Sequence, residues 1–221
     1  MTVAVYTCVT GTFDSIKAPS ITSPGVEFYC FTDHPERLRP PWKPRQVEFH
    51  RDNRRTARMH KLLPHKYMPD ADAWVWVDGS MHLQGDVRTA VTKYLAQKDI
   101  AVRIHPWRKP LCAYSEARAC IEIGKDDPDL IKTQMDRYRA EGYPERHGMV
   151  DSAFLLRRNT AECRRFNEAW WAELDGGSLR DQLSFNYTSW KTGIGFQLMS
   201  NAGHRTDQWV HFYGHGTHHR V

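Results

Sequence analysis

Asp78 follows the apolar residues 74–77, and its carboxylate is the first side chain that we expect to do chemistry. Four consecutive apolar residues, two Trp and two Val, are typical of a short buried strand. Open α/β sheets bind ligands beyond the carboxyl ends of their strands, and carboxylate oxygen suits Mg²⁺ or Mn²⁺ that carries phosphate. Asp78-Gly79 is also a common two-residue hairpin turn, and on this stretch alone we favour the hairpin slightly.

The densest basic segment, residues 54–61, precedes this strand. On a helix, Arg54, Arg58 and Lys61 would share one face, because they are four and three residues apart. That face can clamp a diphosphate, since Arg and Lys bind phosphate oxygens. A solvated helix face is the simpler interpretation of a charge run. Its position just before Asp78 makes the two interpretations about equal.

The C-terminal segment, residues 209–219, is rich in histidine. Neutral imidazole is a good ligand for divalent transition metals, and His211, His215 and His218 have spacings that would let them share an ion. A flexible polar tail is the alternative. We expect one metal-binding histidine here rather than a zinc site built from this segment alone.

Three further carboxylates are candidates for a general base. Asp181 lies near a predicted helix start, where it can stabilise the helix dipole, act as a base or orient a sugar hydroxyl. Glu116 follows His105-Pro106, and Asp151 precedes a predicted strand. A structural role is the simpler interpretation of each one alone.

Composition limits the class of protein. The net charge of +5 and the pI near 9.0 mildly favour an anionic partner such as a nucleotide or nucleic acid. Five Cys, with no Cys-x-x-Cys pair, indicate reduced core thiols in a cytoplasmic compartment. We see no signal peptide and expect no transmembrane segment. Motifs of kinases, dinucleotide oxidoreductases and serine hydrolases are absent from the sequence.

The alternation of strand and helix patterns predicts an α/β fold, with one domain over residues 1–221 and a mostly parallel sheet flanked by helices. Predicted strands cover residues 3–9, 26–31, 74–77, 100–104 and 153–156. Predicted helices cover residues 53–63, 87–95, 114–123 and 129–141, then a segment capped by Asn159 that ends near Leu174, and one that Ser178 opens. Polar clusters follow several strands and would converge on one sheet edge.

Short motifs recur in a fixed order along the chain. They are Arg58-x-x-Lys61-x-Leu63-Pro64, Trp76-Val77-Asp78-Gly79-Ser80, His105-Pro106 with Glu116-Ala117, Leu155-Leu156-Arg157-Arg158-Asn159, Trp170, and Asp181-Gln182-Leu183-Ser184-Phe185. This order resembles the glycosyltransferase-like domain family once known only as a domain of unknown function, with members in plant Golgi proteins and in bacteria. The resemblance covers most of the chain, from about Val3 to His215.

The resemblance implies a GT-A fold, which is Rossmann-like, and a hexosyl- or pentosyltransferase that uses a nucleotide-diphosphate sugar, with a UDP-sugar as the expected donor. It also implies Mn²⁺ or Mg²⁺ bound by an Asp-x-Asp motif. Here the motif is Asp78-Gly79-Ser80, so the second carboxylate is missing. Related retaining enzymes take a ligand from a C-terminal His, and His211 or His215 would then complete the site with Asp78 and Ser80.

The resemblance also implies roles for other residues. Arg58 and Lys61, with the metal ion, would stabilise the charge on the leaving diphosphate. The expected donor-binding set is Thr10, Gly11, Thr32, Asp33, Arg58, Lys61, Asp78, Gly79, Ser80 and Gln182. An inverting reaction would need a base, with Asp181, Asp151 and Glu116 as candidates in that order. In a retaining reaction Asp181 would instead orient the sugar or stabilise its cation.

The acceptor is open at this point: a glycan, a lipid or a nucleic acid. Two other classes of protein also fit the residues. One is a metal-dependent hydrolase that uses Asp78 and the C-terminal histidines. The other is a basic module that binds nucleic acid through the helix face of residues 54–61.

Overall fold

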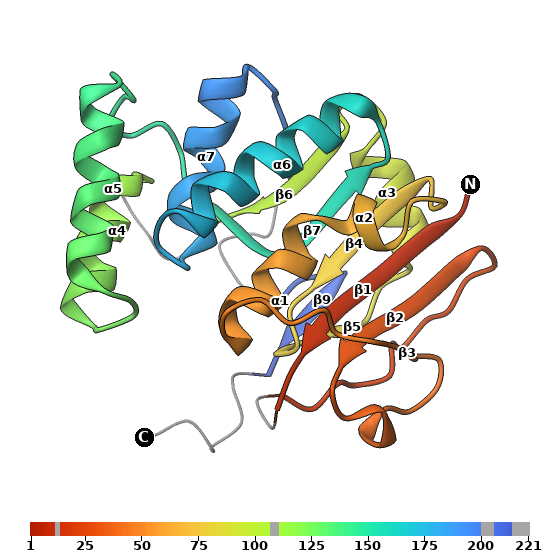
Figure 1. Cartoon of the computed structure of the whole chain (residues 1–221). Coiled ribbons are helices and arrows are strands. Elements are labelled where there is room, and N and C mark those ends of the chain that lie inside the picture. Colours follow the sequence, from red (N-terminus) through yellow and green to blue (C-terminus); the bar gives the residue numbers. More distant parts are fainter. Residues whose placement is uncertain (12–13, 107–110, 200–205, 214–221) are drawn as a thin grey trace.

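The computed structural model describes residues 1–11, 14–106, 111–199 and 206–213 (Figure 1). The strands are β1 (Val3–Val9), β2 (Val26–Thr32), β3 (Lys43–Arg45), β4 (Ala73–Val77), β5 (Met81–Leu83), β6 (Ile100–Ile104), β7 (Val150–Arg158), β8 (Gln197–Met199) and β9 (Val210–Phe212). The helices are α1 (Asn53–Leu62), α2 (Pro64–Tyr67), α3 (Val87–Tyr94), α4 (Ala113–Glu122), α5 (Pro128–Ala140), α6 (Ala161–Asp175) and α7 (Asp181–Thr192), with a 3₁₀ turn at Pro35–Arg37.

The main sheet has seven strands in the order β3-β2-β1-β4-β7-β6-β8. β7 runs antiparallel to both of its neighbours, and the other neighbouring strands are parallel. The expected mostly parallel α/β fold is therefore confirmed. The order β3-β2-β1-β4 is the first half of a Rossmann-like sheet, in which ligands bind where the strand order reverses, between β1 and β4.

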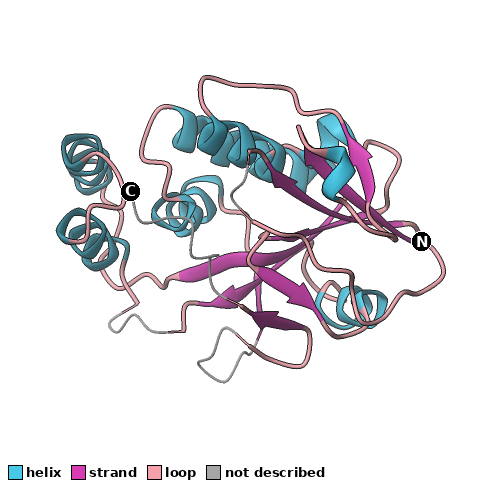
Figure 2. Cartoon of the chain, turned by 90° about the horizontal axis from the view of Figure 1, so that it is seen from below, coloured by secondary structure: helices cyan, strands magenta, loops and turns pink. Residues whose placement is uncertain are grey.

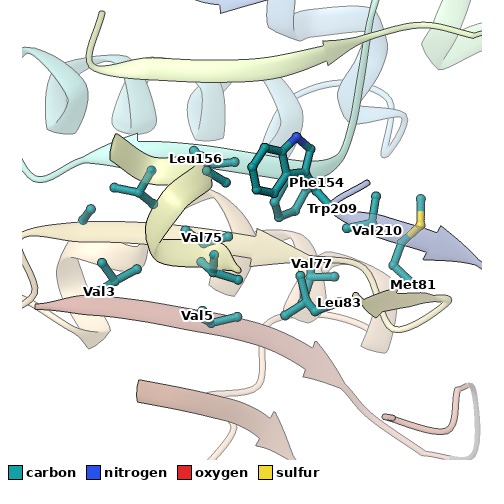
Figure 3. Packing of buried hydrophobic residues seen from close by; sticks show 14 of the residues in the cluster. Val3, Val5, Val75, Val77, Met81, Leu83, Phe154, Leu156, Trp209 and Val210 are labelled. Carbon is teal, nitrogen blue, oxygen red and sulfur yellow. The ribbon is translucent and has the colours of Figure 1, made fainter. Parts of the chain in front are cut away.

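Alternate residues of the central strands enter two separate cores, as the two-residue period of a strand requires. Val75 and Val77 of β4 pack on one face with Leu156 and Trp209 (Figure 3). Trp74 and Trp76 of the same strand point to the other face. Because the central strands are buried on both faces, their sequences are continuous apolar runs.

Helices cover both faces of the sheet (Figure 2). α3 closes the first core together with the small sheet of β5 and β9, which lies beyond the end of β4. α1, α6 and α7 close the second core. A third cluster joins α4 and α5 to α7, and these two helices stand beside the sheet in Figure 1. No helix in the described ranges is long and apolar enough to cross a membrane.

The five cysteines are buried and unpaired, so the expected core thiols are confirmed. The cytoplasmic compartment that we inferred from them stays a prediction.

Three local predictions are wrong. Asp78-Gly79 is not a hairpin turn, because β5 pairs with the distant β9 rather than with β4. The N-cap of α6 is Thr160, whose hydroxyl accepts the Cys163 N–H, whereas Asn159 donates to backbone carbonyls of the segment before β4. Ser178 opens no helix; its hydroxyl donates to Asp126, and α7 begins at Asp181.

The expected convergence of polar residues on one edge of the sheet is confirmed for three adjacent strands. β2, β1 and β4 are neighbours and parallel, so residues 32–33, 10–11 and 78–80 follow their carboxyl ends side by side. β7 is antiparallel and begins at this same edge, where the Asp78 N–H donates to Ala153 O at 2.9 Å.

Candidate active site

A buried cluster of opposite charges lies at this edge, between α1, β4, β7 and α7. Its centre is Lys61, whose side chain is only 1% exposed. The Lys61 Nζ lies 2.6 Å from Asp181 Oδ2, 3.1 Å from Ser152 Oγ and 3.4 Å from Asp78 Oδ1. An ammonium group has three N–H donors, so these three oxygens take all of them.

α1 is anchored at both ends, which fixes where Lys61 points. Asp52 caps the first turn by accepting the Arg55 N–H at 2.8 Å. At the other end, Tyr6 donates its hydroxyl to Lys61 O at 2.6 Å, and the buried Arg157 donates to the same carbonyl. A buried guanidinium at a helix C-terminus is stabilised by the carbonyls that no helical N–H reaches.

Asp181 is the first residue of α7 and is 4% exposed. Lys61 and Ser152 both donate to its Oδ2, at 2.6 and 3.0 Å, and Arg58 Nε lies 3.8 Å from the same oxygen. Within the described residues, nothing donates to Oδ1. Burial alone would raise the pKa of this carboxyl, but the charges of Arg58 and Lys61 outweigh burial and hold the pKa well below its usual range. Asp181 is therefore a firmly ionised carboxylate with one oxygen left for a ligand.

Asp78 is held by its own strand. Trp76 Nε1 donates to Asp78 Oδ1 at 2.6 Å, and Asp78 O accepts the Met81 N–H at 2.9 Å, which closes a turn between β4 and β5 that is not a hairpin. The Asp78 side chain is 29% exposed, so one edge of the carboxylate faces solvent.

Arg58 is the more accessible cation of this cluster, with 24% of its side chain exposed. Its Nε also donates weakly to Leu179 O at 3.5 Å. Burial would lower the pKa of Arg58, but the carboxylates of Asp181 and Asp78 outweigh burial and raise it. Arg54, which we expected on the same face, instead donates to Lys125 O. Only two of the three predicted cations therefore reach the cluster.

The loop after β1 is tied to the end of β2. The Gly11 N–H lies 2.9 and 3.0 Å from the two carboxylate oxygens of Asp33, and Gly11 adopts φ = 64°, which favours glycine. Thr10 and Thr32 are buried beside them, and Thr32 Oγ1 accepts the His34 N–H. Asp33 therefore lies at the carboxyl end of β2, directly beside the loop after β1.

Gly79 lets this loop approach the end of β4. A Cβ at Gly79 would lie 2.9 Å from the side chain of Asp14 and 3.1 Å from Val9 Cγ2. Only a residue without a side chain therefore fits without displacing the segment after β1.

The described residues do not fit the expected divalent ion. Ser80 stands where a second carboxylate would be, and its side chain is buried. His211 lies opposite His82 in the β5–β9 pair, with Nδ1 3.4 Å from Thr206 Oγ1. No group of three or more His, Cys, Asp or Glu that could hold a metal exists within the described ranges. His215 lies outside the described residues.

The other candidate residues have different surroundings. Asp151 is buried at the start of β7 and accepts the Ala153 N–H at 3.2 Å. Glu116 is buried on α4 and accepts from the Cys120 thiol. Gln182 is buried next to Asp181 and accepts from Arg180.

Sequence reasoning missed Ser152, which donates to Asp181 and contacts Lys61. Arg157 stands in one of the sequence motifs and Arg180 next to another, but no role was predicted for either; Arg157 fixes the end of α1, and the charge of Arg180 helps to lower the pKa of Asp181. Serine at a strand start has no pattern of its own. Arg180 carried a usable signal, because it directly precedes the Asp181-Gln182 motif.

Comparison with known proteins indicates the family of the chain. A model of the TOD1/MUCI70 glycosyltransferase-like domain matches residues 44–206. The chain is 28% identical over 211 residues to the probable hexosyltransferase MUCI70 of Arabidopsis thaliana, which covers 83% of this chain and 36% of that protein. It is also 28% identical over 138 residues to the alkaline ceramidase TOD1 of the same plant, covering 58% and 29% of the two chains. The chain thus spans about a third of the length of these relatives.

Proposed function

The chain belongs to the family of TOD1/MUCI70 glycosyltransferase-like domains, and from this premise we propose that it transfers a sugar from a nucleotide-diphosphate sugar to an acceptor at the carboxyl edge of its sheet. The name of the relative with the longer match favours a hexose as the sugar. UDP-sugar remains the donor that we expect. A glycan, a lipid and a nucleic acid are all compatible acceptors, and the basic net charge favours an anionic one.

The observation that carries the proposal is the buried cluster of Lys61, Asp78, Asp181 and Ser152. It lies beside the point where the strand order reverses, which is where this class of sheet binds ligands. Burying the polar groups of Lys61, Asp181 and Ser152 for stability alone is inefficient, because desolvation costs about as much as the attraction returns. A carboxyl whose pKa is lowered as strongly as that of Asp181 is typical of functional sites.

We infer the following placement of the donor. Thr10, Gly11, Thr32 and Asp33 hold the nucleoside at the ends of β1 and β2. Arg58, the accessible cation, binds the diphosphate and stabilises the negative charge that grows on it as the bond to the sugar breaks. Gly79 and Gln182 line the space on either side of that bond.

Asp181 acts as an ionised carboxylate that accepts a hydrogen bond from a sugar hydroxyl or stabilises positive charge on the sugar. An efficient general base has a pKa near the working pH, and the pKa of Asp181 lies far below it. This is the role that a retaining reaction would need. For an inverting reaction, Asp151 and Glu116 remain as candidate bases.

The divalent ion stays a prediction of the sequence, with Asp78, Ser80, His211 and His215 as its expected ligands. A bound Mn²⁺ or Mg²⁺ would supply positive charge to the leaving diphosphate. Asp78 is the one carboxylate of this set.

A hydrolase is the second candidate, favoured by the name of the relative that is an alkaline ceramidase. The same ionised carboxylates could then bind a polar head group. Hydrolysis of a ceramide or a phosphoester without any nucleotide sugar would support this candidate.

The test is a thermal-shift screen of nucleotide-diphosphate sugars, followed by measurement of nucleoside diphosphate release in the presence of acceptor mixtures. A ligand at 100 times its dissociation constant stabilises the folded state by about 2.7 kcal/mol. We expect one donor to raise the melting temperature in wild type and in the surface variant Lys66→Ala, but much less in Arg58→Ala. Failure of every donor, with and without Mn²⁺, would refute the proposed function.

A further inference from the structure

Two carboxylates at the end of the sheet, Asp78 and Asp181, face the same small space, which is a common arrangement for binding a divalent cation. In this chain a cation is already there. The Lys61 Nζ lies 3.4 Å from Asp78 Oδ1 and 2.6 Å from Asp181 Oδ2, and so it joins the two carboxylates as a metal ion would.

The cation at this position is a buried side chain of the protein rather than an ion bound from solvent. Its side chain is 1% exposed, and Ser152 takes its third donor at 3.1 Å. The same group lies 5.4 Å from the centroid of the Trp76 ring, so an aromatic face completes its surroundings. The side chains of Tyr6 and Arg157 donate to the carbonyl oxygen of Lys61 and so fix its backbone.

The two carboxylates of this cluster are neutralised without a metal. Lys61 and Arg58 supply two positive charges against the two negative charges of Asp78 and Asp181, and Arg180 adds a third positive charge near Asp181. An added divalent ion on Asp78 would lie next to the ammonium of Lys61 and be repelled by it. Ser80, where a second carboxylate would be needed to overcome that repulsion, offers only a hydroxyl.

We propose that the Lys61 ammonium occupies the cation position of this site, so that the chain binds a nucleoside diphosphate through the accessible guanidinium of Arg58 and without a divalent metal ion. The identity of the ligand rests on the proposed function. The position of the cation does not, because it follows from the contacts of Lys61 alone.

A single substitution that removes the Lys61 charge should therefore create a binding site for a divalent ion. Lys61→Met keeps an unbranched side chain, one atom shorter than lysine, and removes the charge, which leaves Asp78 and Asp181 without their shared cation. A divalent ion can then enter the space between them and stabilise the variant. Adding Asp181→Asn removes one of the two carboxylates and with it this new site.

The experiment measures melting temperatures of the intact chain in EDTA and in Mn²⁺. For wild type and for the surface control Lys66→Met, we expect the two values to agree within about 1 °C. Lys61→Met should melt lower in EDTA and gain about 3 °C or more in Mn²⁺. The double variant Lys61→Met/Asp181→Asn should not gain. A Mn²⁺ gain in wild type that Asp78→Asn abolishes would overturn the inference.

A second measurement keeps the inference testable if Lys61→Met does not fold. Calorimetry of UDP binding to wild type should give dissociation constants in EDTA and in Mn²⁺ that agree within about threefold, a difference under about 0.7 kcal/mol. Binding only in Mn²⁺ would overturn this inference and leave the proposed function standing. If no nucleotide binds in either condition, the proposed function fails, and the melting temperatures of wild type still decide the position of the cation.

Discussion

The pair of Lys61 and Asp181 should be strongly coupled in stability, and a double-mutant cycle can measure this. The two groups lie 2.6 Å apart with side chains 1% and 5% exposed. In Lys61→Met, the buried charge of Asp181 loses the ion pair that offsets its desolvation. Asp181→Asn removes the same ion pair from Lys61. Each single change leaves a charge without its partner, whereas the double change removes both charges of the pair.

The magnitude follows from this burial. Removing one partner of a buried pair costs about 3–5 kcal/mol, because the remaining charge stays desolvated. For a chain of this size that corresponds to a fall of about 6–20 °C in melting temperature. The double variant should lose less than the sum of the single losses, by about 2–3 kcal/mol.

Urea unfolding of the four chains supplies the free energies, provided that the slope with denaturant is unchanged. The chain offers its own control, the surface pair of Lys66 and Glu168, which lie 3.0 Å apart but are 50% and 47% exposed. We expect a coupling of less than about 1 kcal/mol there. A coupling between Lys61 and Asp181 no larger than that of the control would show that burial does not strengthen this ion pair.

Three further outcomes are expected. Because the pKa of Asp181 is lowered in the folded state, its carboxyl stabilises the fold above its ordinary pKa of about 4, and this is lost as the pH falls toward the lowered value. The stability gap between wild type and Asp181→Asn, measured in urea, should stay constant from about pH 6 to 8 and shrink below about pH 4. Gly79→Ala places a Cβ 2.9 Å from Asp14, and it should cost about 1–3 kcal/mol in urea unfolding and weaken nucleotide binding. Asp33→Asn disturbs the contact with Gly11, and it should weaken nucleotide affinity in calorimetry about tenfold while changing stability by less than about 1 kcal/mol.

These predictions have clear controls. Gly176→Ala adds a methyl group that meets only a carbonyl at 3.4 Å, so it should leave nucleotide binding unchanged. A loss of affinity in that variant equal to the loss in Gly79→Ala would contradict the close approach of the β1 loop. A gap for Asp181→Asn that grows at low pH would contradict the lowered pKa.

The long strands and helices were predictable because their signals are local. β1 and β6 match their predicted ranges, and α3 matches the helix predicted over residues 87–95 to within one residue. The three-residue strands were not predicted, because so few residues show no period and their pairing depends on distant segments. The failed hairpin at Asp78 has this cause: β5 pairs with β9, about 130 residues later in the chain.

The residues of the site were predictable from the sequence, but their contacts were not. Arg58, Lys61, Asp78 and Asp181 were singled out by residue type and order, and the structure brings these four together. How they pair was not predictable, because it depends on the crossing of α1 and α7 over the sheet. Ser152 has no sequence signal, and its role follows only from its position at the start of β7 beside Asp78.

We propose that the carboxyl edge of the sheet binds a nucleotide-diphosphate sugar, and calorimetry can measure this binding for wild type, Arg58→Ala and Lys66→Ala with UDP-sugars and other nucleotide sugars. We expect at least one donor to bind wild type and Lys66→Ala equally, and Arg58→Ala at least about tenfold more weakly. Equal affinity of the donor for Arg58→Ala and wild type, or the absence of any binding, would contradict it.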